Sequence, residues 1–85
     1  MEYNPRLAAL AINFSEIIGE WEVEDEVLFH KILMVALKKS GFGEVSLEEV
    51  NRNIKYYLTE ATDVDVYALP ESEMDMPPIK ESELQ

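Results

Sequence analysis

Three patterns in the sequence contain residue types that could carry chemistry, and each of them is incomplete. His30 is the only histidine, and a general base would need a nucleophile and an orienting group beside it, which the sequence does not indicate. The stretch Gly41-Phe42-Gly43 lacks the preceding strand and the following Lys-Ser or Lys-Thr of a phosphate-binding loop. Asp63-Val64-Asp65 has alternate carboxylates, but Tyr67 stands where a calcium-binding loop would have its third ligand. The sequence therefore predicts no enzyme, no metal site and no cofactor.

Five apolar residues are better suited to binding a protein partner. Trp21 stands alone in an acidic run just before an apolar helix that contains Phe29, and its ring can anchor either the helix packing or a partner, with packing favoured. Tyr67, Leu69 and Pro70 form an apolar island in an acidic segment. They predict a short linear motif in which Tyr67 and Leu69 enter a groove while Pro70 limits the entropy lost on binding. A strand-like piece that folds back over the helices is an equally open interpretation.

Two helices precede residue 41. The first begins at Asn4-Pro5, because asparagine caps free backbone N–H groups and proline fits the first helical position, and we expect it to end near Gly19. Its apolar residues extend beyond one stripe, so it should need cover on two faces. The second runs from about Glu24 to Ser40 and is apolar around most of its circumference, which predicts that it is the central helix. Gly41 should cap it in the left-handed conformation.

The third helix follows a capping signal, because the Ser46 hydroxyl can accept a hydrogen bond from the Glu49 N–H. Apolar residues then recur at intervals of three and four up to Ala61. Residues 63–85 contain seven acids, one base and three prolines, too polar a composition to order itself. The predicted fold class is therefore all-α, with a three-helix domain in residues 1–62 and an extended, acidic C-terminal tail in residues 63–85.

Charge and composition restrict the partners. The 85 residues carry a net charge of −11, which repels nucleic acid phosphates and attracts basic proteins. The acidic run at residues 20–26 suits a helix amino terminus, or else a contact with a basic partner. There is no cysteine for a disulfide or thiolate metal site, no basic leader and no apolar run long enough to cross a bilayer. We expect an intracellular protein, cytoplasmic or nuclear, that contacts neither membrane nor nucleic acid directly.

These features resemble the MRG-binding protein family, the non-catalytic subunits of histone acetyltransferase complexes. The segment Trp21 to His30 is similar to the Trp-x-Val-Glu-x-Glu-Val pattern that leads to Leu-Phe in that family, with one residue fewer after Val27. The helix Val45 to Leu58 is similar to a later family helix, and Ala68 to Glu73 to its acidic, proline-containing continuation. Tyr67-x-Leu69-Pro70 resembles the Phe-x-Leu-Pro motif that docks onto MRG domains. The family's basic, histidine-containing stretch is absent, and residues 1–20 have no counterpart.

The resemblance covers about residues 21–75 and implies a scaffold in chromatin acetylation that docks an MRG-type domain through Tyr67, Leu69 and Pro70. The leading functional hypothesis is thus a non-enzymatic protein–protein adaptor. The alternative is an acidic inhibitor, of the type that phages encode, which blocks a nucleic-acid enzyme by imitating phosphate charge. Residues 1–62 hold eleven acids against six bases, which is a thin excess for such a mimic. A homodimer in which the second helix packs on its twin is the third hypothesis.

Overall fold

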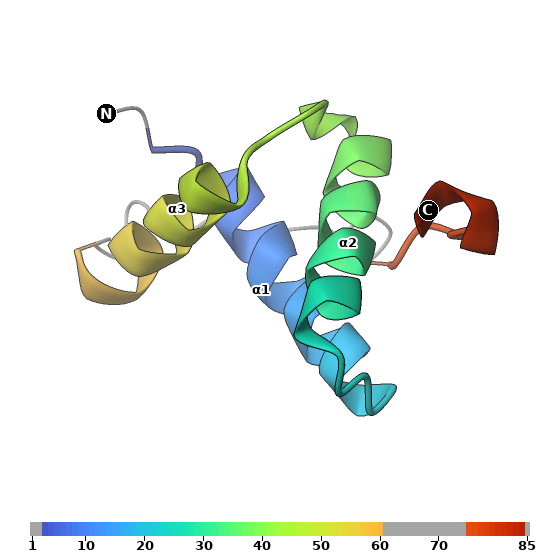
Figure 1. The fold of residues 1–85 in the computed structure, drawn as a ribbon. Coiled ribbons are helices and arrows are strands. Elements are labelled where there is room, and N and C mark those ends of the chain that lie inside the picture. Colours follow the sequence, from blue (N-terminus) through green and yellow to red (C-terminus); the bar gives the residue numbers. More distant parts are fainter. Residues whose placement is uncertain (1–2, 61–74, 85) are drawn as a thin grey trace.

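The computed structural model describes residues 3–60 and 75–84, and these residues form an all-α fold (Figure 1). Three α-helices make up its body: α1 (Pro5–Glu20), α2 (Glu26–Leu37) and α3 (Leu47–Thr59). A π-helical turn, η1 (Lys38–Phe42), follows α2, and a 3-10 turn, η2 (Glu81–Leu84), ends the described chain. The predicted fold class and the three predicted helices are confirmed. None of the helices in the described ranges has both the length and the apolar content needed to cross a bilayer.

The starts of α1 and α3 lie where their caps predict them. The Asn4 side chain accepts a hydrogen bond from the Leu7 N–H at 3.1 Å, and Pro5 occupies the first helical position. The Ser46 hydroxyl accepts from the Glu49 N–H at 3.1 Å. Each cap satisfies a backbone donor that has no partner within its own helix, so the start of the helix is fixed locally.

The second helix is shorter than predicted at both ends. The Asp25 carboxylate accepts from the N–H groups of Val27 and Leu28, at 3.0 and 3.3 Å, so α2 begins at Glu26. One carboxylate of the acidic run is therefore a helix cap, as the helix-terminus interpretation requires. Beyond Leu37 the backbone passes into η1, and Gly41 adopts φ of +100°, in the left-handed region that favours glycine. The predicted role of Gly41 at this helix end is confirmed.

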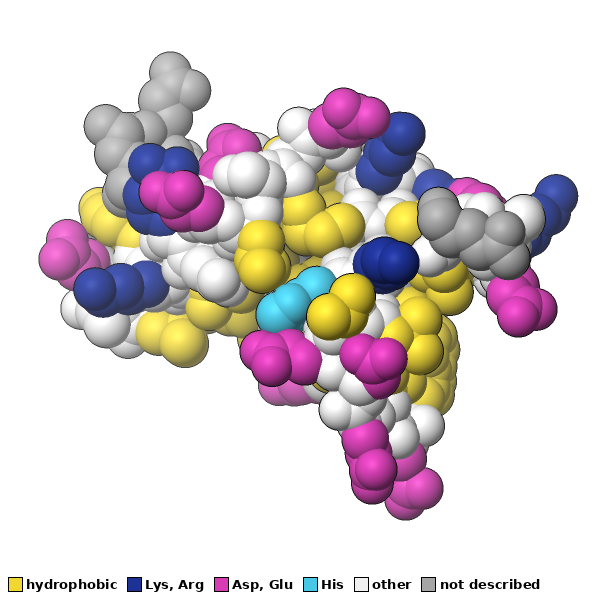
Figure 2. Space-filling view, viewed as in Figure 1, with side chains coloured by type: hydrophobic (Ala, Val, Ile, Leu, Met, Phe, Trp, Pro, Cys, Tyr) yellow, Lys and Arg dark blue, Asp and Glu magenta, His cyan; other side chains and the backbone are white. Residues whose placement is uncertain are grey.

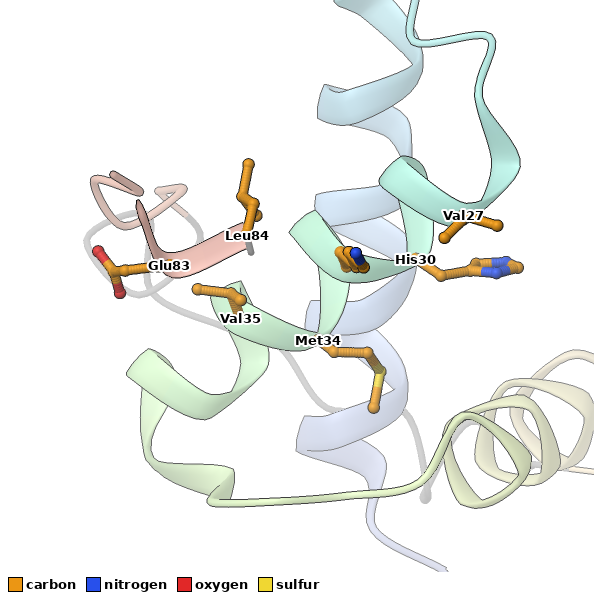
Figure 3. Close-up of a pocket in the computed structure, with 7 residues that line it drawn as sticks. Val27, His30, Met34, Val35, Glu83 and Leu84 are labelled. Carbon is orange, nitrogen blue, oxygen red and sulfur yellow. The ribbon is translucent and has the colours of Figure 1, made fainter. Parts of the chain in front are cut away.

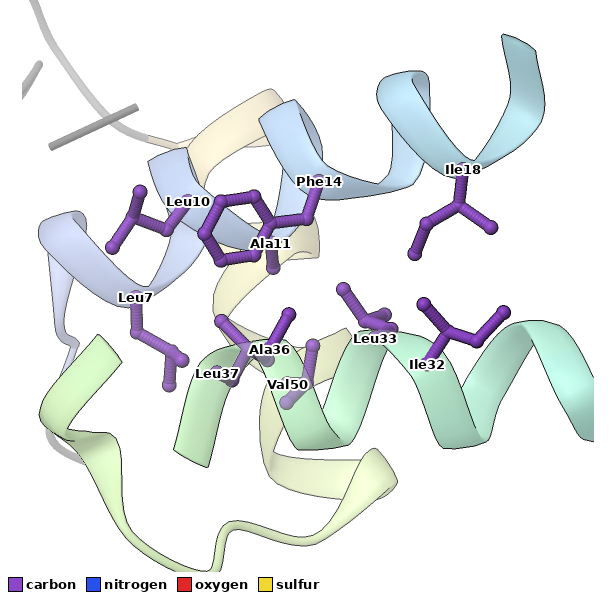
Figure 4. Close-up of a cluster of buried hydrophobic side chains, with 10 residues drawn as sticks. All are labelled: Leu7, Leu10, Ala11, Phe14, Ile18, Ile32, Leu33, Ala36, Leu37 and Val50. Atoms are coloured by element: carbon purple, nitrogen blue, oxygen red, sulfur yellow. The ribbon is translucent and has the colours of Figure 1, made fainter. Parts of the chain in front are cut away.

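The central helix is α1, which packs against both α2 and α3, and the prediction that the second helix is central is wrong. Ala8 and Ala11 are fully buried in α1, and their small side chains allow its two neighbours to approach on different sides. The cover on two faces that the sequence predicted for this helix is thus confirmed. Buried apolar side chains of the three helices meet in one cluster (Figure 4), made of Leu7, Leu10, Ala11, Phe14, Ile18, Ile32, Leu33, Ala36, Leu37 and Val50.

Residues 75–84 pack back onto the helical body. Met76, Ile79 and Leu84 lie against the core cluster, and η2 contacts α2. The Lys39 Nζ donates to the Pro78 carbonyl at 2.6 Å and pairs with the Glu83 carboxylate at 2.7 Å. The prediction that residues 63–85 form an extended tail is therefore wrong for residues 75–84, because apolar contacts and Lys39 hold them to α2.

Candidate partner-binding surface

The outer face of α2 carries apolar residues that α1 does not cover. Val27, His30, Lys31, Met34 and Val35 follow the i, i+3, i+4, i+7, i+8 spacing that places residues on one face of a helix. The side chain of Val27 is 64% exposed. The buried residues of α2 lie on the opposite face, toward α1 (Figure 4). Met34 and Val35 are half-buried, and Met34 also packs against the core cluster. The helix therefore has one apolar face in the core and a second one that is only partly covered.

A hollow of about 400 Å³ lies on this outer face (Figure 3), and we call it the α2 groove. Its lining residues come from α2 and η2 and are Val27, His30, Lys31, Met34, Val35, Glu83 and Leu84. Figure 3 shows Glu83 and Leu84 on one side of α2, with Val27 and His30 on the other. Because its walls are mostly aliphatic, the groove is suited to apolar side chains of a binding partner.

Acidic side chains gather at one end of this groove. Glu20, Glu22, Glu24, Asp25 and Glu26 are all exposed and lie in or beside the turn between α1 and α2, directly before Val27. Figure 2 shows Asp and Glu side chains gathered over this turn, at the bottom of the view. At the other end of α2, Lys38 and Lys39 are paired with carboxylates, so their charge is locally balanced. The potential along the groove is therefore most negative at its Val27 end.

Trp21 is not a core residue, and the favoured prediction that it anchors the helix packing is wrong. It caps the carboxyl end of α1 and its side chain is 52% exposed. The chain turns just after it, with Glu22 at φ of +58°. Trp21 instead lines a second hollow, of about 310 Å³, beneath the C-terminal segment, together with Ile32, Met76, Pro77, Pro78, Ile79 and Leu84.

Of the other predicted binding residues, only Phe29 lies in the described part of the chain, and it does not line the α2 groove. Phe29 is half-buried and packs against the core cluster, with its ring edge-on to His30 at 6.2 Å between centroids. Tyr67, Leu69 and Pro70 lie outside the described residues. Sequence reasoning missed Val27, Met34 and Val35. The available signal was the excess of apolar residues around the second helix, but the sequence does not show which of its faces is turned outward.

No group of three or more His, Asp or Glu residues in residues 3–60 and 75–84 is positioned to hold a metal ion. The pKa of Glu83 is lowered, because its carboxylate accepts hydrogen bonds from the Lys39 ammonium and from the Lys80 backbone N–H, at 2.7 and 3.1 Å. Both hydrogen-bond donors favour the charged form of Glu83, and the ion pair with Lys39 helps to hold the C-terminal segment against the end of α2.

Comparisons with known proteins give no match: no protein-family model, no curated protein and no solved structure is similar to this chain. The resemblance to MRG-binding proteins therefore stays a prediction.

Proposed function

We propose that this protein is a non-enzymatic adaptor that holds a protein partner on the outer face of α2. The observation that supports this function is the partly open apolar face formed by the exposed Val27 and the half-buried Met34 and Val35, on a helix whose other face is already in the core. A solvated helix normally has a polar outer face, and contiguous exposed apolar side chains often mark an interaction site. A partner would remove these side chains from water.

The test is a comparison of three purified baits in an extract of cells that express the protein. The first is the wild type, and the second is the double variant V27Q/V35Q, which makes the groove polar without adding charge. The third is the matched control L58Q, because Leu58 is 69% exposed but lies on the outer surface of α3. Glutamine has a better helix propensity than valine, so V27Q/V35Q should remain folded, which circular dichroism checks.

A partner of the groove should be retained by the wild type and by L58Q, and lost by V27Q/V35Q. Quantitative mass spectrometry of the retained proteins gives the answer. If folded V27Q/V35Q retains every protein that the wild type retains, the outer face of α2 is not the binding surface and the proposed function fails.

The sequence resemblance suggests one specific partner, an MRG-type chromatin domain docked by Tyr67, Leu69 and Pro70. Its support is the match of residues 67–70 to the family's docking motif. Replacing both Tyr67 and Leu69 with alanine should cost about 2 kcal/mol of binding, a loss of about 30-fold, as truncation of anchor residues does. Isothermal titration against a purified MRG domain measures this, with S72A as the control, and an unchanged affinity would retire this partner while leaving the adaptor proposal intact.

A further inference from the structure

The length and residue spacing of the α2 groove fit a helical segment. From Val27 to Val35 the outer face rises about 12 Å, at about 1.5 Å per residue. A partner helix of about two to three turns therefore covers it completely. Side chains at i, i+4 and i+7 of a partner helix can pack between the side chains with the same spacing on α2. An amphipathic helix bound in an apolar groove is a recurrent form of peptide recognition.

The charges around the groove define the polar face of such a helix. Five exposed carboxylates lie within residues 20–26, and that run contains no basic residue. We propose, building on the adaptor function, that the α2 groove binds a basic amphipathic helix of the partner. The apolar face of this helix lies on Val27, Met34 and Val35, and its cationic side chains face the carboxylates of residues 20–26.

A second copy of this chain fits the groove less well. In a symmetric dimer each residue at the centre of the interface meets its own counterpart. The centre of the outer face is Lys31, midway between Val27 and Val35, so two ammonium groups would meet there. The acidic run of each copy would also approach Lys38 and Lys39 at the far end of the other α2. These two lysines are already paired with Glu44 and Glu83, so they would add little attraction between the copies. Two chains of net charge −11 repel each other in addition.

The test uses three synthetic peptides of equal length, each labelled with a fluorophore. The first has leucines at i, i+3, i+4, i+7 and i+8 and lysine or arginine elsewhere. The second keeps the leucines and replaces the bases with glutamate. The third has the composition of the first in an order that forms no apolar face. Fluorescence anisotropy at low and at physiological salt measures binding of each peptide to the full chain.

The protein variants separate the apolar contribution from the electrostatic one. V27Q/V35Q removes the apolar contacts, and E22Q/E24Q/E26Q removes three carboxylates beside the groove. The matched control, E16Q/E48Q/E60Q, removes the same charge from exposed positions elsewhere. If each screened charge pair contributes about 0.5 kcal/mol, the loss from E22Q/E24Q/E26Q should be about tenfold, against less than about threefold for the control.

The basic amphipathic peptide should bind at least about 30-fold more tightly than either other peptide, and its binding should weaken with salt. Equal binding of the acidic peptide, equal binding of the scrambled peptide, or equal losses from the two triple variants would overturn the inference. So would sedimentation showing a stable dimer of the wild type that V27Q/V35Q dissociates. If the extract experiment identifies a groove-dependent partner and the basic peptide does not bind, this inference fails and the adaptor function stands.

Discussion

Replacing Asn53 with alanine should destabilise the protein, because this side chain joins α3 to the start of α1. Asn53 is 3% exposed, in a core that is otherwise apolar among the described residues. Its Oδ1 accepts from the Asn4 N–H at 2.8 Å, and its Nδ2 donates to the Glu49 carbonyl at 2.8 Å. Alanine removes both hydrogen bonds and leaves the two backbone groups without these partners.

The magnitude follows from these two bonds. Each is worth about 1 kcal/mol net, so their loss costs about 2 kcal/mol, and the better helix propensity of alanine returns about 0.5 kcal/mol. The expected decrease in the free energy of unfolding is therefore about 1.5 kcal/mol, or about 8 °C in Tm for a domain of this size. Urea denaturation followed by circular dichroism measures it. The matched control is N51A, since Asn51 is an exposed asparagine of the same helix, and this variant should be neutral or slightly more stable.

The variant N53D distinguishes the two bonds. Its carboxylate can still accept from the Asn4 N–H, but at neutral pH it has no proton to donate to the Glu49 carbonyl. Burial beside that carbonyl should raise the pKa of the introduced carboxyl above about 3.9. The penalty relative to wild type is then full above the raised folded-state pKa and shrinks as the pH falls through it, because the protonated group can donate. Equal stabilities of N53A and N51A, or a penalty for N53D that does not change with pH, would refute this account of Asn53.

Further changes test two helix ends and the contact that holds the C-terminal segment. G41A should lower the free energy of unfolding by about 1 kcal/mol, because the φ of +100° at Gly41 is strained for any residue with a Cβ atom. G19A should raise it by about 0.5 kcal/mol, since Gly19 lies in α1 with open space around its Cβ position. Thermal unfolding of the two variants measures both changes. The pKa of Glu83 is lowered from its ordinary value of 4.5, so its contribution to stability is full above that value and is lost as the pH falls through the folded-state pKa. Tryptophan fluorescence should therefore report release of the C-terminal segment in acid, and K39M should remove this transition.

The features that sequence predicted correctly depend on neighbouring residues. The caps at Asn4 and Ser46 each bind a backbone N–H three residues further along the chain, and Gly41 needs only its own conformational freedom. Residue types alone are sufficient to identify such contacts. The all-α class followed in the same way, from apolar spacing within each helix.

The features that were missed depend on packing between distant segments. A helix that is apolar around its circumference does not reveal which face meets its neighbour, so Val27 and Val35 could not be separated from Ile32 by periodicity alone. The second helix has the higher apolar content, but α1 is central because its buried alanines admit two partners. The composition of residues 75–84 suggested a solvated tail. Average composition does not show that a few apolar side chains, here Met76, Ile79 and Leu84, pack against the core cluster of the helices.

The α2 groove is formed by α2 together with η2, which lies far from α2 in the sequence. Neither segment alone therefore predicts the groove. Leu84 lines both the α2 groove and the hollow beneath Trp21, so its position shapes the two surfaces together. That position depends on the contact between Lys39 and Glu83, which are 44 residues apart in the chain. The sequence of α2 alone determines its apolar outer face. Glu83 and Leu84, which complete the groove, lie beside this face only when residues 75–84 are packed on the helical body. A partner that contacts Leu84 in the groove must therefore also favour the docked C-terminal segment, because binding and docking stabilise the same arrangement.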